Sequence, residues 1–223
     1  LVVIDSLGVG EAPDAELYGD LGTNTLANVS KAVGGVSLPN MEKLGFGRIT
    51  NVVNMSNLNI ATVGRLSEKS VGNDSTTGHW ELAGLTTETE FRIFEDGFPE
   101  ELIQNIEKEA NCNFIGNRHA SGTEIIEELG SQHIETGELI LYTSGDSVFQ
   151  IAAHEKVCSL EKLYEICKIS RKYCNQYNIG RVIARPFVGD KGSFKRTYDR
   201  KDYGMAPPGE TILSLLYKNN IKT

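Results

Sequence analysis

Amphipathic helical segments alternate with short apolar runs between residues 97 and 187, and this alternation limits the fold more than any other feature of the sequence. A proline and two acidic residues at positions 99–101 precede a segment with Leu102, Ile103 and Ile106 on one face, which predicts a helix. The remaining predicted elements are a helix with capping-box spacing at 121–124 that stops at Gly130, a strand at 138–143, a helix at 160–177 and a strand at 181–187 stopped by Pro186. Such alternation predicts an α/β fold, with helices layered on a small sheet.

The amino-terminal part opens on an apolar run at residues 1–5 that ends in the carboxylate of Asp5. Continuous apolar runs are typical of buried parallel strands, and ligands gather beyond the carboxyl ends of such strands. Asp5 is therefore either a site residue or a cap of the following turn. Helices are predicted at residues 23–33, 41–44 and 210–218. Because the run begins without a Met and the chain ends just after a helical pattern, we expect a piece of a longer protein.

The composition excludes several classes of protein. A formal net charge of −8 argues against a protein that binds nucleic acid through its phosphates. No apolar run is long enough to span a bilayer and no signal-peptide pattern is present, so we expect a cytoplasmic protein with no membrane partner. The four cysteines lack CxxC spacing, which favours reduced, structural thiols.

The stretch NDSTTGHWE, at residues 73–81, places three hydroxyls before a helical segment. Such a hydroxyl either caps the helix or accepts a phosphoryl group that the helix N-terminus stabilises, and both roles can hold together. A threonine hydroxyl needs a base or a metal ion to attack phosphorus. Asp5 is a suitable oxygen ligand for Mg²⁺ or Mn²⁺, but one carboxylate cannot hold a catalytic metal and the four histidines lack metal-motif spacing.

Two further groups of residues are candidates for ligand binding. The stretch YTSGDSVFQ, at 142–150, either presents hydroxyls and a carboxylate to a sugar or forms a turn with Asp146 on local amides. A basic set either binds a phosphosugar or forms a solvated surface, and its members are Arg181, Arg185, Lys195, Arg196 and Arg200.

Six motifs in order make the sequence resemble the phosphopentomutase family of the alkaline phosphatase superfamily. They are VVIDSLGVGEAPDA (2–15), GNDSTTGHWELAGL (72–85), ASGTEIIEELG (120–130), YTSGDSVFQIAAHE (142–155), RVIARPFVG (181–189) and KRTYDRKDY with APPG (195–209). The resemblance implies a partial alkaline phosphatase-like core with an inserted, smaller α/β cap domain. The expected boundaries are a first core segment at 1–90, a cap that determines specificity at 91–206 and the start of the returning core at 207–223.

The resemblance also implies an isomerase that interconverts ribose 1-phosphate and ribose 5-phosphate, or the 2-deoxy sugars, through a 1,5-bisphosphate. Thr77 matches the phosphorylated threonine, and Asp5 and Thr77 match ligands of two Mn²⁺ ions, with Mg²⁺ possible. The substrate-binding residues implied are Ser144, Asp146, Val148, Arg181, Ile183 and Arg196, of which Arg181 and Arg196 are expected on the distal phosphate. The family carries most of its metal ligands after the cap, and none of the residues up to Thr223 replaces them.

Two other functions stay open at this point. One is another metal-dependent phosphatase or mutase of the same superfamily, such as one acting on phosphoglycerate. The other is a non-catalytic sugar-phosphate-binding module. The sequence does not decide between ribose and deoxyribose, and it gives no oligomeric state.

Overall fold

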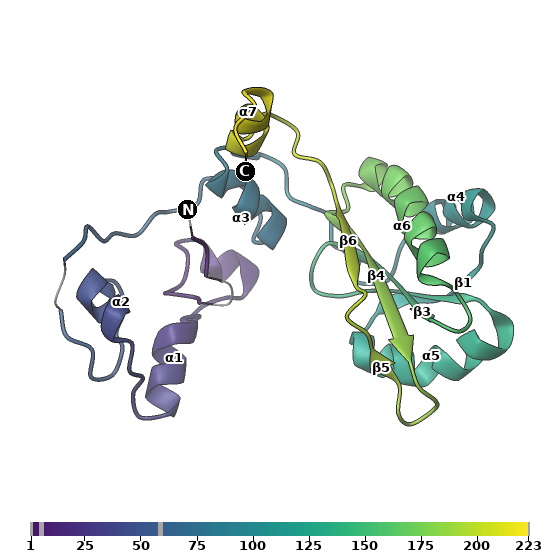
Figure 1. The fold of residues 1–223 in the computed structure, drawn as a ribbon, viewed down its shortest axis with the longest axis horizontal. Helices are drawn as coiled ribbons and strands as arrows, with labels where there is room; N and C mark the ends of the chain where they lie inside the picture. The colour runs from purple at the N-terminus through teal and green to yellow at the C-terminus, as the bar shows by residue number, and fades with distance from the viewer. Residues whose placement is uncertain (1, 5–6, 58–59, 223) are drawn as a thin grey trace. The chain divides into compact units, whose positions relative to one another are not determined.

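The computed structural model of the 223-residue chain describes residues 2–4, 7–57 and 60–222. The chain forms two compact units, Leu1–Lys69 and Ser70–Thr223. The second unit is a mixed α/β structure built on one sheet (Figure 1). The α/β class predicted from the sequence is therefore confirmed, whereas the domain boundaries at 90 and 206 stay predictions.

The first unit consists of short helices joined by loops. Its elements are η1 (Ala15–Tyr18), α1 (Thr25–Ala32), α2 (Pro39–Leu44) and η2 (Phe46–Arg48). Helix α1 begins after Asn24, whose side chain accepts a hydrogen bond from the N–H of Ala27, and it ends before Gly34 at a φ of 74°. The helices predicted at 23–33 and 41–44 are confirmed.

The buried strand predicted at residues 1–5 does not form in the part that the structure describes. Leu1 and Asp5 lie outside the described residues, and residues 2–4 have no strand assignment and carry exposed side chains. A strand needs a neighbour to satisfy its backbone groups, and no strand is found in residues 7–57 or 60–69 to supply one.

Two helices of the second unit lie outside its sheet. Helix α3 (Ser75–Leu82) and helix α7 (Ile212–Lys218) are joined by a hydrogen bond of 2.8 Å from the N–H of Ile212 to the carbonyl of Ala83. Helix α7 begins with a capping box made by Thr211 and Ser214. The predicted helix at 210–218 is confirmed.

The sheet of the second unit combines parallel and antiparallel pairs. Strand β1 (Phe114–His119) lies parallel to β2 (Leu139–Thr143), and β3 (Val148–His154) lies antiparallel to β2 and parallel to β4 (Arg181–Val188). The far edge of β4 pairs antiparallel with two short strands, β5 (Lys195–Arg196) and β6 (Lys201–Gly204).

Helices cover both faces of this sheet (Figure 1). Helices α4 (Glu100–Ala110) and α6 (Leu160–Cys174), the latter extended by η3 (Asn175–Tyr177), pack on one face through Leu102, Ile106 and Ile166. Helix α5 (Gly122–Thr136) covers part of the opposite face through Ile125 and Ile126.

The structure corrects three details of the predicted elements. Gly130 does not stop α5, because it lies inside the helix against the ring of Phe194, and Gly137 in a left-handed conformation ends the helix instead. Ser121 precedes α5 without a capping hydrogen bond from its side chain, so the predicted capping box is wrong. Pro186 does not stop β4. Pairing with β6 reaches only Ala184 and pairing with β5 starts at Phe187, so neither of these two strands needs an N–H from Pro186.

Candidate functional site

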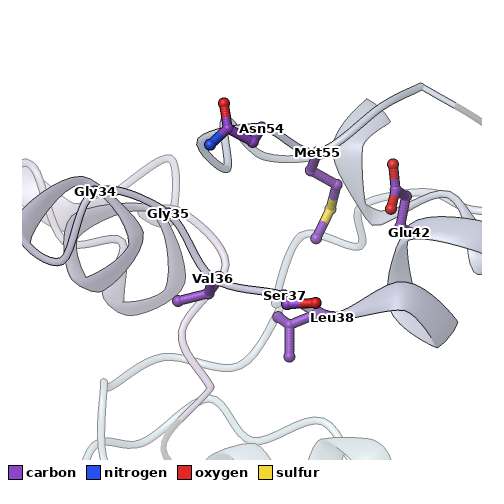
Figure 2. Close-up of a pocket in the computed structure, with 8 residues that line it drawn as sticks. All are labelled: Gly34, Gly35, Val36, Ser37, Leu38, Glu42, Asn54 and Met55. Carbon is purple, nitrogen blue, oxygen red and sulfur yellow. The ribbon is translucent and has the colours of Figure 1, made fainter.

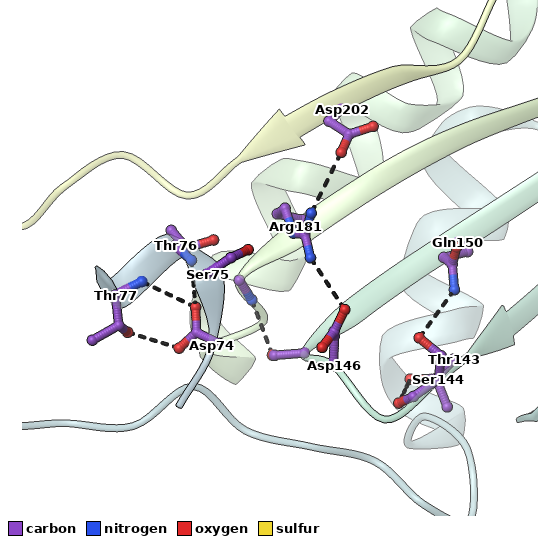
Figure 3. A network of polar contacts seen from close by, with 12 residues as sticks. Asp74, Ser75, Thr76, Thr77, Thr143, Ser144, Asp146, Gln150, Arg181 and Asp202 are labelled. Carbon is purple, nitrogen blue, oxygen red and sulfur yellow. Dashed lines mark hydrogen bonds and ion pairs between the residues drawn. The ribbon is translucent and has the colours of Figure 1, made fainter. Parts of the chain in front are cut away.

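Thr77 lies in the first turn of α3 and is fully buried. Its hydroxyl donates a hydrogen bond of 2.7 Å to Oδ2 of Asp74, and its N–H donates one of 3.0 Å to Oδ1 of the same carboxylate (Figure 3). The N–H of Thr76 donates to the same Oδ1 at 2.8 Å. One carboxylate therefore fixes the backbone of the first turn and the rotamer of Thr77.

Helix α3 is capped by the side chain of Asp74 and not by any of the three hydroxyls. Asp74 occupies the N-cap position in extended conformation, so Ser75, Thr76 and Thr77 all lie inside the first turn. Ser75 is exposed and Thr76 is half-buried, whereas Thr77 alone directs its hydroxyl onto a carboxylate. The sequence analysis did not select Asp74, although an Asp three residues before a candidate nucleophile at a helix start was a readable signal.

The loop between β2 and β3 holds the next group of predicted residues. Ser144 accepts a hydrogen bond of 3.4 Å from Nε2 of Gln150, and the carboxylate of Asp146 lies 3.4 Å from Nη2 of Arg181 (Figure 3). The side chain of Asp146 therefore reaches β4, where it pairs with Arg181. Val148 begins β3, directly opposite Arg181 of β4.

Arg181 lies between two carboxylates. Its Nη1 is 3.7 Å from Oδ2 of Asp202, which also accepts a hydrogen bond of 2.6 Å from Arg200. Asp202 was not selected from the sequence, because its place opposite Ile183 depends on the pairing of β6 with β4. The positive charge of Arg181 is thus matched by two negative groups.

The structure brings most of the predicted substrate residues together, but not all of them. Ser144, Asp146, Val148, Arg181 and Ile183 lie on or beside the adjacent strands β3 and β4. The side chains of Val148 and Ile183 are each 2% exposed, so they form the apolar floor of this region rather than its surface.

Arg196 and Thr77 lie on other elements. Arg196 is on β5, where it lines a pocket with the first turn of α5. Thr77 lies on α3, and among the described residues no hydrogen bond or ion pair joins it to the six substrate residues.

The described residues do not by themselves form a metal centre. Residues 2–4, 7–57 and 60–222 contain no group of three or more His, Cys, Asp or Glu side chains that could hold an ion. The carboxylate that contacts Thr77 is Asp74, and the predicted ligand Asp5 lies outside the described residues. None of the described helices is long and apolar enough to cross a membrane.

A separate pocket of about 340 Å³ lies in the first unit, lined by Gly34–Leu38, Glu42, Asn54 and Met55 (Figure 2). Its one carboxylate, Glu42, accepts a hydrogen bond of 2.8 Å from the N–H of Ser56, and hydrogen bonding to Ser56 lowers the pKa of Glu42. Glu42 is the one titratable side chain among the described residues that line this pocket.

Comparison with curated proteins relates the chain to one family. It is 53% identical over 219 residues to the phosphopentomutase of Carboxydothermus hydrogenoformans, a match that covers 97% of this chain and 56% of that protein. It is 50% identical to the phosphopentomutases of Clostridium novyi and Thermotoga petrophila, over 99% of this chain and 57% and 58% of those proteins. The chain belongs to the phosphopentomutase family. It spans a little over half the length of these relatives, and no family model matches it.

Proposed function

We propose that this chain provides the phosphoryl-accepting threonine and the substrate-binding cap of a phosphopentomutase. The whole protein would interconvert ribose 1-phosphate and ribose 5-phosphate, and the corresponding 2-deoxy sugars. Identity of 49 to 53% to four phosphopentomutases supports the reaction class. The single structural observation that supports it best is the buried Thr77 hydroxyl, held on Asp74 at the N-terminus of α3.

We assign the parts of the chain by the same reasoning. Residues 1–90 would form the first segment of an alkaline phosphatase-like core, residues 91–206 the cap, and residues 207–223 the start of the returning core. The hydrogen bond between Ile212 and Ala83 supports the last assignment, because it joins residues after the proposed cap to residues before it.

The proposed reaction moves one phosphoryl group away from Thr77 and another one back. Phosphothreonine 77 transfers its phosphoryl group to O5 of ribose 1-phosphate, which loses its hydroxyl proton and becomes ribose 1,5-bisphosphate. The Oγ–P bond breaks and leaves Thr77 as a free hydroxyl. After the bisphosphate turns round, Oγ of Thr77 attacks the phosphorus on O1 and the O1–P bond breaks. O1 then takes up a proton from solvent, which balances the proton that O5 released to solvent, and ribose 5-phosphate leaves.

Asp74 is proposed to assist both half-reactions. When Thr77 attacks, its hydroxyl proton has an acceptor 2.7 Å away in Oδ2 of Asp74. When the phosphoryl group leaves, the same carboxyl returns the proton to Oγ. The start of α3 also favours a phosphate on Thr77, because backbone N–H groups and the helix dipole stabilise negative charge there.

The proposed cap would recognise the sugar. Ser144 and Asp146 present a hydroxyl and a carboxylate that can bond ribose hydroxyls, and Arg181 holds Asp146 in place. Val148 and Ile183 would limit the room beneath the ring, since their side chains are buried. Arg196 is exposed on β5 and would contact phosphate.

Family membership implies a divalent metal ion, and we propose two Mn²⁺ ions, or Mg²⁺, with Asp5 and Thr77 among their ligands. Such ions would neutralise charge on the phosphoryl oxygens. Because the described residues hold no such centre alone, further ligands would have to come from outside them. The proposed partner is a small sugar phosphate in the cytoplasm, rather than a nucleic acid or a membrane.

The test is phosphorylation and turnover of the whole protein with Thr77→Ala. Tandem mass spectrometry should find one phosphoryl group on Thr77 of the wild type, and the variant should lose both that group and mutase turnover. Thr76→Ala is the matched control, because Asp74 bonds only the backbone N–H of Thr76 and the variant keeps it. Mutase turnover by Thr77→Ala would exclude Thr77 as the nucleophile. Wild-type activity on a three-carbon phosphoester but not on pentose phosphates would indicate another enzyme of the superfamily.

A further inference from the structure

Ser147 turns its side chain into the protein at the end of the loop between β2 and β3. It is 5% exposed, whereas Gly145 and Asp146 of the same loop are exposed. Its hydroxyl donates a hydrogen bond of 2.6 Å to the carbonyl of Arg92 and accepts one of 3.1 Å from the N–H of Gly180. One buried hydroxyl thus satisfies two backbone groups that are distant from it in the sequence.

The backbone of Ser147 is fixed as well. Its carbonyl accepts a hydrogen bond of 3.1 Å from the N–H of Arg181, at the start of β4. The N–H of Val148 donates one of 2.9 Å to the carbonyl of Asp146, so Ser147 is the middle residue of a three-residue turn. Ser147 therefore sets the position of the two predicted substrate residues on either side of it.

The partners of Ser147 belong to a turn at residues 178–180 that is itself held from several sides. Its first carbonyl accepts a hydrogen bond of 3.0 Å from the N–H of Arg92, and the carbonyl of Gly180 accepts one of 2.8 Å from the N–H of Met205. The guanidinium of Arg171 on α6 donates to its last two carbonyls, at 2.6 and 3.3 Å. Because Arg92 and Met205 lie at the two ends of the proposed cap, Ser147 fixes the loop to the base of that cap.

The carboxylate of Asp146 is held only weakly by its own contacts. Its side chain is 64% exposed, and it lies 3.4 Å from Nη2 of Arg181 (Figure 3). Asp202, 3.7 Å from Nη1, competes for the same guanidinium. Exposed ion pairs of this kind contribute little to holding a side chain in place. The position of Asp146 therefore depends on its backbone, which Ser147 fixes.

We propose that Ser147 is a positioning residue for sugar binding and that it acts through Asp146. In the proposed function, on which this role rests, the carboxylate of Asp146 accepts hydrogen bonds from ribose hydroxyls. A carboxylate on a fixed backbone binds them more tightly than a mobile one, because less conformational entropy is lost on binding. Ser147 acts indirectly, since its buried hydroxyl is already bonded to Arg92 and Gly180.

Calorimetric titration of the whole protein with ribose 5-phosphate tests this role. Ser147→Ala should weaken binding about tenfold, because Asp146 loses the fixed position from which it makes charged hydrogen bonds. Ser170→Ala is the matched control and should bind as the wild type does. It removes another buried serine hydroxyl, which bonds the carbonyl of Ile166 within α6 at 2.8 Å. Wild-type affinity in folded Ser147→Ala would overturn the proposal.

A double-mutant cycle with Asp146→Ala separates positioning from a general loss of structure. If Ser147 acts through Asp146, then adding Ser147→Ala to Asp146→Ala should weaken binding by less than about twofold, because the group that Ser147 positions is already absent. A further tenfold loss in the double variant would show that Ser147 acts independently of Asp146, and the proposed role would be wrong.

Ser147→Cys keeps the test valid if Ser147→Ala fails to fold. A thiol fills the place of the hydroxyl but forms only weak hydrogen bonds, so affinity for ribose 5-phosphate should fall at least about threefold. Wild-type affinity in this variant would then overturn the proposal.

The proposed function is judged separately, by mutase turnover and by phosphorylation of Thr77 in the wild type. If both are absent but ribose 5-phosphate binding depends on Ser147 and Asp146 as described, the proposed function fails and the positioning role stands. If the wild type is an active mutase but its affinity is unchanged in the Ser147 variants, the reverse holds. A wild type that does not bind ribose 5-phosphate would overturn the positioning role.

Discussion

The hydroxyl of Thr77 and its backbone N–H both bond to the carboxylate of Asp74, at 2.7 and 3.0 Å. Asp74 is thus the N-cap of α3, and it is also the proposed proton acceptor of Thr77. The two roles can be separated by substitution, because a neutral side chain can cap a helix but cannot accept the hydroxyl proton as a carboxylate does.

Asp74→Asn should therefore lower mutase turnover of the whole protein by about 10²- to 10⁴-fold, the usual contribution of a general base. The free energy of unfolding should change little, because Asn and Asp are comparable N-caps. Steady-state kinetics and chemical denaturation measure the two effects, and Asp96→Asn on the exposed surface is the matched control. Full mutase turnover in Asp74→Asn would show that Asp74 acts only as the helix N-cap and not as a general base.

Gly130→Ala tests why a glycine lies inside α5. An added Cβ would come within 2.6 Å of the Phe194 ring, which itself packs 5.3 Å from the ring of Phe187. Overpacking of this kind costs about 1–3 kcal/mol, and the better helix propensity of Ala returns up to about 1 kcal/mol. We expect a net loss of about 1 kcal/mol in the free energy of unfolding.

Urea denaturation of Gly130→Ala measures this loss. Gly64→Ala is the control, since a Cβ at Gly64 would meet open space, and its stability should stay level or rise slightly. Equal stability of the two variants would show that Phe194 moves aside freely.

His133 should make the second unit sensitive to acid. Its Nε2 accepts a hydrogen bond of 2.8 Å from the N–H of His154, and its Nδ1 lies 2.6 Å from the carbonyl of Glu138, so the buried ring is neutral. Burial lowers the pKa of His133 below its usual 6.5; the hydrogen bond to the carbonyl of Glu138 offsets part of this shift, and His154 adds a smaller lowering. Protonation would break the bond to His154.

The direction of the pH effect follows from this shift. Below pH 6.5 His133 binds a proton in the unfolded chain but stays neutral in the folded chain. The free energy of unfolding therefore falls as the pH drops below 6.5. The loss levels off once the pH is below the folded-state pKa. Denaturation curves of His133→Gln should lose this part of the pH dependence, whereas the exposed His119→Gln should keep it.

Local patterns predicted the helices of this chain well, because apolar spacing at Leu102 and Ile106 or at Leu163 and Ile166 is a property of each segment alone. The short strands β5 and β6 depend on pairing with distant residues of β4, so the sequence did not reveal them. The same limit applies to the candidate site, where Arg181 is balanced by Asp202 through that pairing.

At Gly130 a local sequence signal gave a wrong prediction. A glycine after a helical pattern predicts a stop, yet this one is required by Phe194, which follows it by more than sixty residues. Its role therefore became visible only in the folded chain.

The four cysteines should be poorly reactive in the folded chain. Cys167 and Cys174 are buried in α6, and Cys112 and Cys158 are half-buried beside the same core. Burial raises the pKa of Cys112 to about 11 and that of Cys174 to about 12, and it raises that of Cys167 even further. The thiolate is the reactive form, so little of it exists at pH 8.

A disulfide reagent added to the native protein at pH 8 should therefore react slowly, and full reaction of these four thiols should require denaturant. The rate of colour development, measured with and without guanidinium, gives the difference in thiol reactivity between the native and the denatured protein. Cys174→Ser should leave the slow native reaction unchanged, because that thiol is among the least accessible, while removing one equivalent after denaturation. Rapid stoichiometric reaction of any of these four cysteines in the native protein would contradict their burial and would identify a thiol open to redox chemistry.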